Sequence, residues 1–146
     1  MKQMYANMIQ KLGNLRDLPL LFVRLVLAYG FYEPATKKWS NIQGIIDWFD
    51  GMNYPLPALN AYLAASAEAA GVILLFLGLG SRVISIPLMI TMLVAIFTVH
   101  LGNGFAAADN GIEIPLYYLI MLLLIFIYGS GKYSLDHLIA NRRYRT

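Results

Sequence analysis

From Ala61 to Ala108 the chain carries only two formally charged residues, Glu68 and Arg82, and this scarcity of charge constrains its fold more than any other feature. Charged residues make up 13% of the whole chain, whereas soluble domains contain about 25%. A soluble domain of this size could not cover its surface with so few charged side chains. The composition therefore excludes an ordinary soluble domain, a disordered chain and a nucleic-acid binder. We expect one domain, residues 1–146, whose solvent is lipid.

Four apolar segments predict an all-α, polytopic membrane protein built as a four-transmembrane-helix bundle. The first span should end at Glu33-Pro34, because Pro34 has no N–H and disfavours helical angles in the residue before it. Between spans one and two, apolar residues with helical spacing predict a short helix on the membrane surface: Ile42, Ile45, Ile46 and Phe49. We expect the four spans at approximately 18–32, 58–79, 83–101 and 112–128.

Basic residues gather on one side of these predicted spans. They occur in an amphipathic head at residues 1–17, in the turn around Arg82 and in a tail at residues 132–146, whereas the loop after the third span has none. Because cytoplasmic loops carry an excess of Lys and Arg, this distribution predicts that both termini are cytoplasmic. Lys37 and Lys38 fall on the opposite side, where we expect a snorkelling or functional role.

Arg24, Glu68 and His100 fall inside the predicted spans, where ionisable residues are costly and by default indicate function. At a rise of about 1.5 Å per residue, Arg24 lies about 9 Å from the inner edge, Glu68 about 16 Å and His100 about 25 Å. Glu68 is thus near the midplane and is a candidate catalytic, proton-accepting residue. Two alternatives stay open: Glu68 pairs with Arg24 as its structural charge partner, or it stays protonated between helices.

We expect an outward-facing polar pocket above Glu68, because Glu33, His100 and Glu113 all lie at the outer ends of spans. His100 is the second candidate catalytic residue. Imidazole and carboxylate groups suit a divalent metal ion held by His100 and Glu113, or proton exchange with a quinol. The alternative is that His100 only caps a helix end and that Glu113 only complements a helix dipole. The predicted ligand-binding residues are Glu33, Lys38, Asn103, Asn110 and Glu113.

A copper site is a further hypothesis. Met89, Met92 and His100 fall close to one helical face, and thioether and imidazole ligands suit Cu(I). Methionine at helical spacing in an apolar span is more often packing. The chain has no cysteine, which excludes disulfides, thiolate metal sites, haem attachment through cysteine and a cysteine redox relay.

Four groups of residues, taken in order, resemble the motifs of the DoxX family of small four-helix membrane proteins. They are Arg24-Leu25 followed by Lys38; Glu68-Ala-Ala-Gly71 followed by Gly78-Leu79-Gly80-Ser81-Arg82; His100 followed by Gly104-Phe105 and Asn110-Gly111-Ile112-Glu113; and Gly129-Ser130-Gly131-Lys132-Tyr133-Ser134-Leu135-Asp136. In addition, the stretch from Trp48 to Pro57 and the stretch from Glu113 to Tyr118 are similar to a branch linked with maturation of copper-binding modified peptides.

The resemblance implies a redox-associated protein of the bacterial inner membrane, because such proteins are tied to thiosulfate:quinone oxidoreductases, oxidative-stress complexes or accessory roles in membrane redox systems. Three functions stay open. The pocket could bind a small ligand, a quinone headgroup, or copper or another divalent metal; the chain could be a non-enzymatic accessory or assembly subunit; or it could serve copper-binding-peptide maturation. The expected partners are the lipid bilayer, a membrane or periplasmic protein, and a second copy of the chain.

Overall fold

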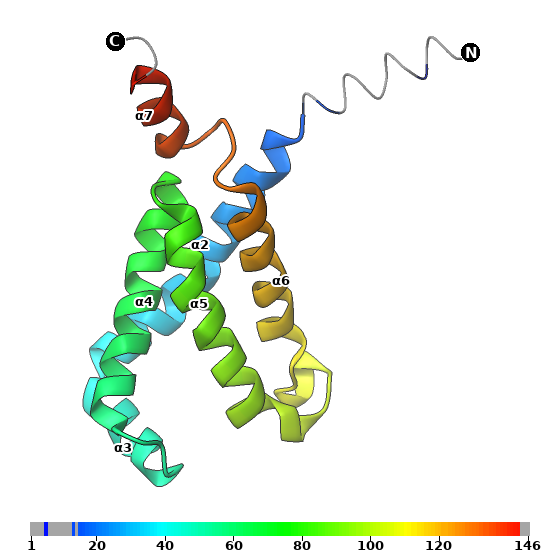
Figure 1. Ribbon diagram of the computed structural model, residues 1–146. Coiled ribbons are helices and arrows are strands. Elements are labelled where there is room, and N and C mark those ends of the chain that lie inside the picture. Colours follow the sequence, from blue (N-terminus) through cyan, green and yellow to red (C-terminus); the bar gives the residue numbers. More distant parts are fainter. Residues whose placement is uncertain (1–4, 6–12, 14, 144–146) are drawn as a thin grey trace.

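The computed structural model describes residues 5, 13 and 15–143, and within these ranges it contains helices and no strand. Figure 1 shows how the helices follow one another along the chain. They are α2 (Asp17–Ser40), α3 (Ile42–Gly51), α4 (Pro57–Leu77), α5 (Ser81–Ala95), α6 (Glu113–Tyr128) and α7 (Leu135–Arg143). A π-helical turn at Ile96–His100 and two 3₁₀ turns, at Leu101–Asn103 and Ala107–Asp109, connect α5 to α6. The predicted amphipathic head at residues 1–17 lies almost wholly outside the described residues.

Within the part of the chain that the structure describes, three helical segments are long and apolar enough to cross a membrane: Asp17–Ser40, Pro57–Leu77 and Ser81–Asn103. Helix α6 is equally apolar but has only 16 residues. The all-helical fold is therefore confirmed. The fourth crossing and the position of α3 on the membrane surface stay predictions.

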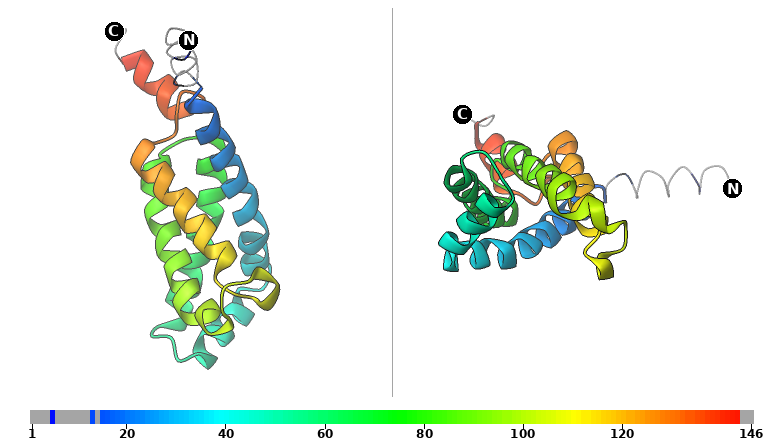
Figure 2. Two further views of the ribbon diagram at one scale, coloured as in Figure 1. Left: turned by 90° about the vertical axis from the view of Figure 1, so that its right-hand side faces the viewer. Right: turned by 90° about the horizontal axis from the view of Figure 1, so that it is seen from below.

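Helices α2, α4, α5 and α6 lie side by side in a bundle, as both views in Figure 2 show. Helix α2 packs mainly against α4, and α5 packs mainly against α6. Small side chains at Ala61 and Ala65, both fully buried, let the backbone of α4 approach α2 closely. The centre of the bundle is filled by side chains from all four helices: Leu27, Phe31, Leu75, Leu88, Leu122 and Ile125.

Helix α2 does not end at Tyr32 as the sequence predicted, but continues through Pro34 to Ser40. A proline inside a helix removes one backbone hydrogen bond and crowds the preceding turn, at a cost of about 3 kcal/mol. Packing of α2 against α4 outweighs that local cost. The hydroxyl of Thr36 also donates to the carbonyl oxygens of Tyr32 and Glu33, at 2.9 and 2.8 Å. The consequence is that Lys38 belongs to the helix rather than to a loop.

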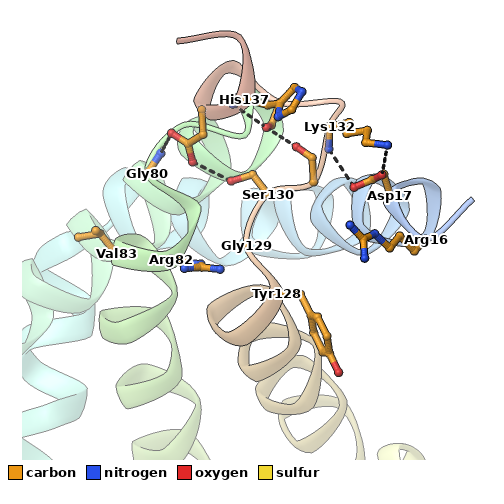
Figure 3. A pocket seen from close by; sticks show the side chains of 13 residues that line it. Arg16, Asp17, Gly80, Arg82, Val83, Tyr128, Gly129, Ser130, Lys132 and His137 are labelled. Atoms are coloured by element: carbon orange, nitrogen blue, oxygen red, sulfur yellow. Dashed lines mark hydrogen bonds and ion pairs between the residues drawn. The ribbon is translucent and has the colours of Figure 1, made fainter. Parts of the chain in front are cut away.

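The end of the bundle near α7 is fastened by polar side chains, part of which Figure 3 shows. The guanidinium of Arg24 is buried and donates to the carbonyl oxygens of Ser130 and Tyr133, at 2.6 and 2.8 Å. The carboxylate of Asp136 accepts from the Gly80 backbone N–H at 2.8 Å and from the Ser130 hydroxyl at 2.7 Å. These bonds join α2, the α4–α5 turn and the α6–α7 loop.

Candidate functional site

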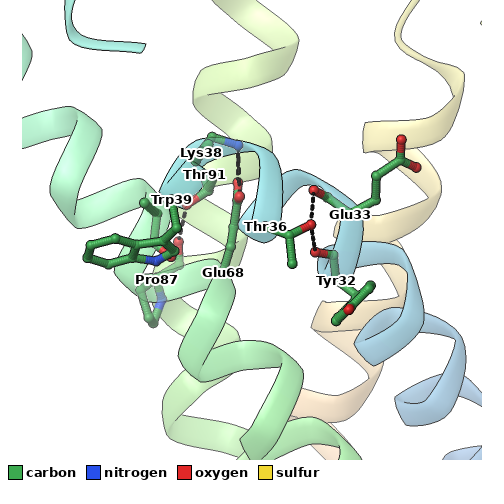
Figure 4. Close-up of polar contacts among 9 residues, drawn as sticks. Tyr32, Glu33, Thr36, Lys38, Trp39, Glu68, Pro87 and Thr91 are labelled. Carbon is green, nitrogen blue, oxygen red and sulfur yellow. Dashed lines mark hydrogen bonds and ion pairs between the residues drawn. The ribbon is translucent and has the colours of Figure 1, made fainter. Parts of the chain in front are cut away.

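The most distinctive polar contact inside the bundle is an ion pair between Lys38 on α2 and Glu68 on α4 (Figure 4). The Lys38 Nζ atom lies 2.9 Å from Oε1 and 2.7 Å from Oε2 of Glu68. The side chain of Glu68 is 3% exposed and that of Lys38 is 18% exposed. Both charges are thus largely removed from solvent and are satisfied by each other.

The predicted pairing of Glu68 with Arg24 is wrong in this structure. Arg24 lies roughly 21 Å before Lys38 along α2, at 1.5 Å per residue, and its guanidinium binds backbone carbonyls of the α6–α7 loop. Lys38 reaches Glu68 because α2 continues past Pro34. From the sequence, Lys38 is expected among the ligand-binding residues and Arg24 as the structural charge partner, whereas in the structure Lys38 is the charge partner of Glu68.

The ion pair lines a cavity of about 1170 Å³, at the end of the bundle away from α7. Most of the lining is apolar and comes from α2, α4, α5 and the start of α6. Ligand pockets typically measure about 300–1,000 Å³ and combine apolar walls with a few placed polar groups. Four of the predicted site residues share this cavity: Lys38, Glu68, His100 and Asn110.

Glu33, Asn103 and Glu113 do not line the cavity. Glu33 forms an ion pair with Lys37 one turn further along α2, with an N–O distance of 2.6 Å. Both side chains are more than 70% exposed, at 71% for Glu33 and 73% for Lys37. Figure 4 shows the Glu33 side chain on the opposite side of α2 from Glu68. The two acidic residues therefore have different surroundings.

The other polar residues at this end fasten the loop between α5 and α6. The carbonyl oxygen of Asn110 accepts from His100 Nδ1 at 2.7 Å and from the Asn103 amide at 3.3 Å. Glu113 accepts from the Ala107 backbone N–H at 2.9 Å and from the Tyr117 hydroxyl at 3.2 Å. Because a carbonyl oxygen only accepts, His100 carries its proton on Nδ1, which leaves Nε2 as an acceptor in the neutral ring.

These donors do not fit a resident metal ion well. Among the described residues there is no group of three or more His, Asp or Glu side chains that could hold one. His100 has one nitrogen left, and both carboxylate oxygens of Glu113 already accept hydrogen bonds. Met89 and Met92 pack against the apolar core of the bundle. The donor set therefore favours the loop-fastening interpretation of His100 and Glu113 over a metal centre shared between them.

Aromatic residues cover the cavity, and this position was not predicted for them from the sequence. Trp48, Phe49 and Tyr54 line it from α3 and from the segment that follows α3. The rings of Phe49 and Tyr54 stack with centroids 4.9 Å apart. The Tyr54 hydroxyl donates to Thr98, which lies in the π-helical turn at the end of α5. Such π-helical turns occur frequently at functional sites, but no pattern in this sequence predicts one.

Tyr118 of α6 is a further aromatic residue that lines the cavity, and its place there was not predicted from the sequence. Its ring packs edge-on against Phe31, with centroids 5.5 Å apart. A β-carbon at Gly30 would overlap the Tyr118 hydroxyl, so the absence of a side chain at Gly30 makes room for this tyrosine. The glycine within an apolar helix was the one signal in the sequence that could have pointed to a close contact.

The sequence of this chain is similar to a known protein family and to several bacterial proteins. The DoxX family model matches residues 19–101. A protein of Haemophilus influenzae, itself uncharacterised, is 34% identical over 124 residues, which cover 82% of each chain. A second uncharacterised protein of Haemophilus influenzae is 31% identical over 132 residues, 88% of this chain and 96% of that one. CatD of Bacillus subtilis, whose name gives it as a candidate oxidoreductase, is 27% identical over 120 residues, 82% of this chain and 86% of its own. No solved structure matches.

Proposed function

This chain is a membrane protein of the DoxX family, and on that premise we propose that it binds the headgroup of a membrane quinone in the cavity beside Lys38 and Glu68. In this proposal the chain is the quinone-facing subunit of a redox system in the bacterial inner membrane. The similarity to CatD, a candidate oxidoreductase by name, supports a redox role. The observation that carries the proposal is the buried ion pair in the wall of an otherwise apolar cavity.

An isolated ion pair that joins two helices within a membrane bundle costs free energy, because both charges lose their hydration. Such residues by default indicate a functional site. Two N–H groups of the Lys38 ammonium are directed to the two oxygens of Glu68. An ammonium has three donors, so one is left for the carbonyl oxygen of a quinone. The apolar walls suit the quinone ring and its tail.

Glu68 supplies the second chemical function, proton exchange. Reduction of a quinone to a quinol takes up two electrons and two protons, and a carboxylate beside the headgroup can accept or return a proton. The electrons would come from a redox centre on a partner protein, since this chain has no cysteine and its described residues form no three-ligand metal cluster. We assign His100 and Asn110 to the cavity rim. Asn103 and Glu113 support that rim through the loop.

The structure offers one specific observation for the alternative of a non-enzymatic accessory or assembly subunit. The Lys38–Glu68 pair joins α2 to α4 directly, so it could serve only to hold the bundle together. No comparable observation favours a role in the maturation of copper-binding peptides, because the predicted metal ligands are engaged in the α5–α6 loop.

The test separates these two functions by titrating a ubiquinone or menaquinone analogue into the purified full-length chain in nanodiscs. We expect Glu68→Gln and Lys38→Met each to weaken binding at least about tenfold, since each removes a polar contact or leaves its partner unpaired. Glu33→Gln and Lys37→Met break the exposed pair one turn away and serve as matched controls, with less than about twofold change.

The single variants could lower binding merely by unfolding the bundle, so a double variant is decisive. Replacing a buried ion pair by apolar residues of similar size is often neutral or stabilising, whereas removing one partner costs about 3–5 kcal/mol. We therefore expect Lys38→Met/Glu68→Leu to be more stable than either single variant and still not to bind quinone. A double variant that binds quinone like the wild type would show that the pair is structural and would favour the accessory function.

A further inference from the structure

A second pocket, of about 550 Å³, lies at the other end of the bundle, next to α7 (Figure 3). It is formed where the start of α2, the α4–α5 turn and the α6–α7 loop come together. Three cationic side chains line it: Arg16, Arg82 and Lys132. Each comes from a different one of these segments, so the fold gathers charges that are far apart in the sequence.

The positive charge of this pocket exceeds its negative charge. Asp17 and Asp136 also line it, and each of these carboxylates has hydrogen-bond donors and a cation close to it. Asp136 accepts from Gly80 and Ser130 and lies near the buried cation of Arg24. Asp17 accepts from the Lys132 backbone N–H at 3.2 Å and faces the Lys132 ammonium at 3.5 Å.

Among the described residues, neither Arg16 nor Arg82 has a carboxylate partner within ion-pair distance. All eight acidic residues of the sequence lie at described positions, and the three ion pairs found there involve only lysines. Arg82 donates one hydrogen bond to the Ile127 carbonyl oxygen at 3.1 Å, which holds its guanidinium beside Gly129. Two arginines without carboxylate partners therefore face the same pocket.

The aromatic residues around the pocket indicate its depth in the membrane. Tyr128, the last residue of α6, lines the pocket and is 69% exposed. Tyr133 in the following loop is also exposed. Tyrosines are enriched at the level of the lipid headgroups, and the apolar helix α6 ends at this point. We therefore expect the pocket to lie at the depth of the phospholipid phosphates.

We propose that this pocket binds the phosphate group of an anionic phospholipid, with Arg16 and Arg82 as its principal contacts. Arginine forms paired hydrogen bonds to phosphate oxygens, and basic pockets between membrane helices suit anionic headgroups. Lys132 and the backbone around Gly129 and Gly131 complete the lining. The proposal is independent of quinone binding, since the two cavities share no residue.

The experiment measures binding of phosphatidylglycerol to the detergent-purified full chain by native mass spectrometry, with phosphatidylcholine as the reference lipid. Each basic residue near a membrane surface strengthens binding about fivefold, so we expect Arg16→Gln and Arg82→Gln each to weaken phosphatidylglycerol binding about fivefold and the double variant about 25-fold. Arg142→Gln, in α7 at the same end but outside the pocket lining, is the matched control and should change binding less than twofold. The melting temperature is recorded for each variant, and Arg16→Gln keeps the test valid if Arg82→Gln unfolds.

Three results would overturn the proposal. The first is equal weakening by Arg142→Gln, which would mean general attraction to the basic end of the molecule. The second is equal binding of phosphatidylcholine, which would mean no recognition of the net charge. The third is that glycerol 1-phosphate or inorganic phosphate binds as tightly as the lipid, which would identify a site for a soluble phosphate instead.

Discussion

At the scale of single residues, Arg24 and Gly78 depend on each other. The buried guanidinium of Arg24 needs space beside the α4–α5 turn to reach Ser130 and Tyr133. Gly78 provides that space, because a β-carbon there would overlap the guanidinium and would lie 2.6 Å from the β-carbon of Ser134. Gly78 also has a left-handed backbone conformation, with φ of 67°.

Gly78→Ala should therefore destabilise the protein through two effects, of which only one acts at Gly80. Gly80 has a similar φ of 58°, but a β-carbon there would meet nothing within 4 Å. We expect Gly80→Ala to cost about 1 kcal/mol for the backbone conformation alone. Gly78→Ala should cost about 2 kcal/mol more because of the overlap. Thermal unfolding of the two variants in the same detergent measures the difference; equal stabilities would contradict this role of Gly78.

The ion pair between Lys38 and Glu68 was predictable from the sequence only in part. The burial of Glu68 was predictable, because an acidic residue in the middle of an apolar segment has few other places to lie. The identity of its ion-pair partner, Lys38, was not predictable. The rule that proline ends a helix is local, whereas the continuation of α2 to Lys38 depends on packing along α4 that only the folded bundle provides.

At the scale of elements, α3 and the segment after it cover the cavity, and among the described residues one side-chain hydrogen bond ties them to the π-helical turn that follows α5. That bond runs from Tyr54 to Thr98. The segment also contains Asn53 and Leu56 with positive φ angles of 56° and 50°, which are unusual for residues other than glycine. The helical spacing of Ile42, Ile45, Ile46 and Phe49 predicted α3 from the sequence, but not that its aromatic residues lie over a cavity.

Tyr54→Phe should loosen this cover without removing the aromatic ring. We expect a loss of about 1 kcal/mol in local stability, the usual contribution of one hydrogen bond, and faster hydrogen exchange confined to residues 42–56. Thr98→Val removes the same bond from the other side and should give the same pattern. Hydrogen exchange followed by mass spectrometry is the measurement. Unchanged exchange in both variants would show that stacking on Phe49, rather than the hydrogen bond, holds the segment.

At the scale of the whole molecule, the described start of α2 and helix α7 lie at the same end of the bundle (Figure 1). This arrangement agrees with an even number of crossings. Helix α6 has 16 residues and is about 24 Å long at 1.5 Å per residue, whereas the hydrocarbon core is about 30 Å thick. The fourth crossing therefore needs local thinning or help from flanking residues.

We predict four crossings with both termini in the cytoplasm. Cysteine placed at Asn110 should react with a membrane-impermeant thiol reagent in intact cells, and cysteine placed at Thr146 should react only after the cells are opened. The absence of native cysteine gives a clean background. Labelling of both positions under the same condition would contradict a fourth crossing and would leave α6 in the interface.

The central claim is that the cavity beside Lys38 and Glu68 holds a quinone headgroup, and a photoreactive quinone tests it most directly. The probe is an azido-quinone incorporated into nanodiscs with the purified chain, illuminated, and located by peptide mass spectrometry. The account predicts labelling of cavity residues on α4 and α5, such as Ala67 or Thr91. This labelling should be suppressed by excess unlabelled quinone and lost in Lys38→Met/Glu68→Leu. Labelling confined to exposed residues outside both cavities, such as Phe22 or Ile73, and unchanged by competitor, would contradict it.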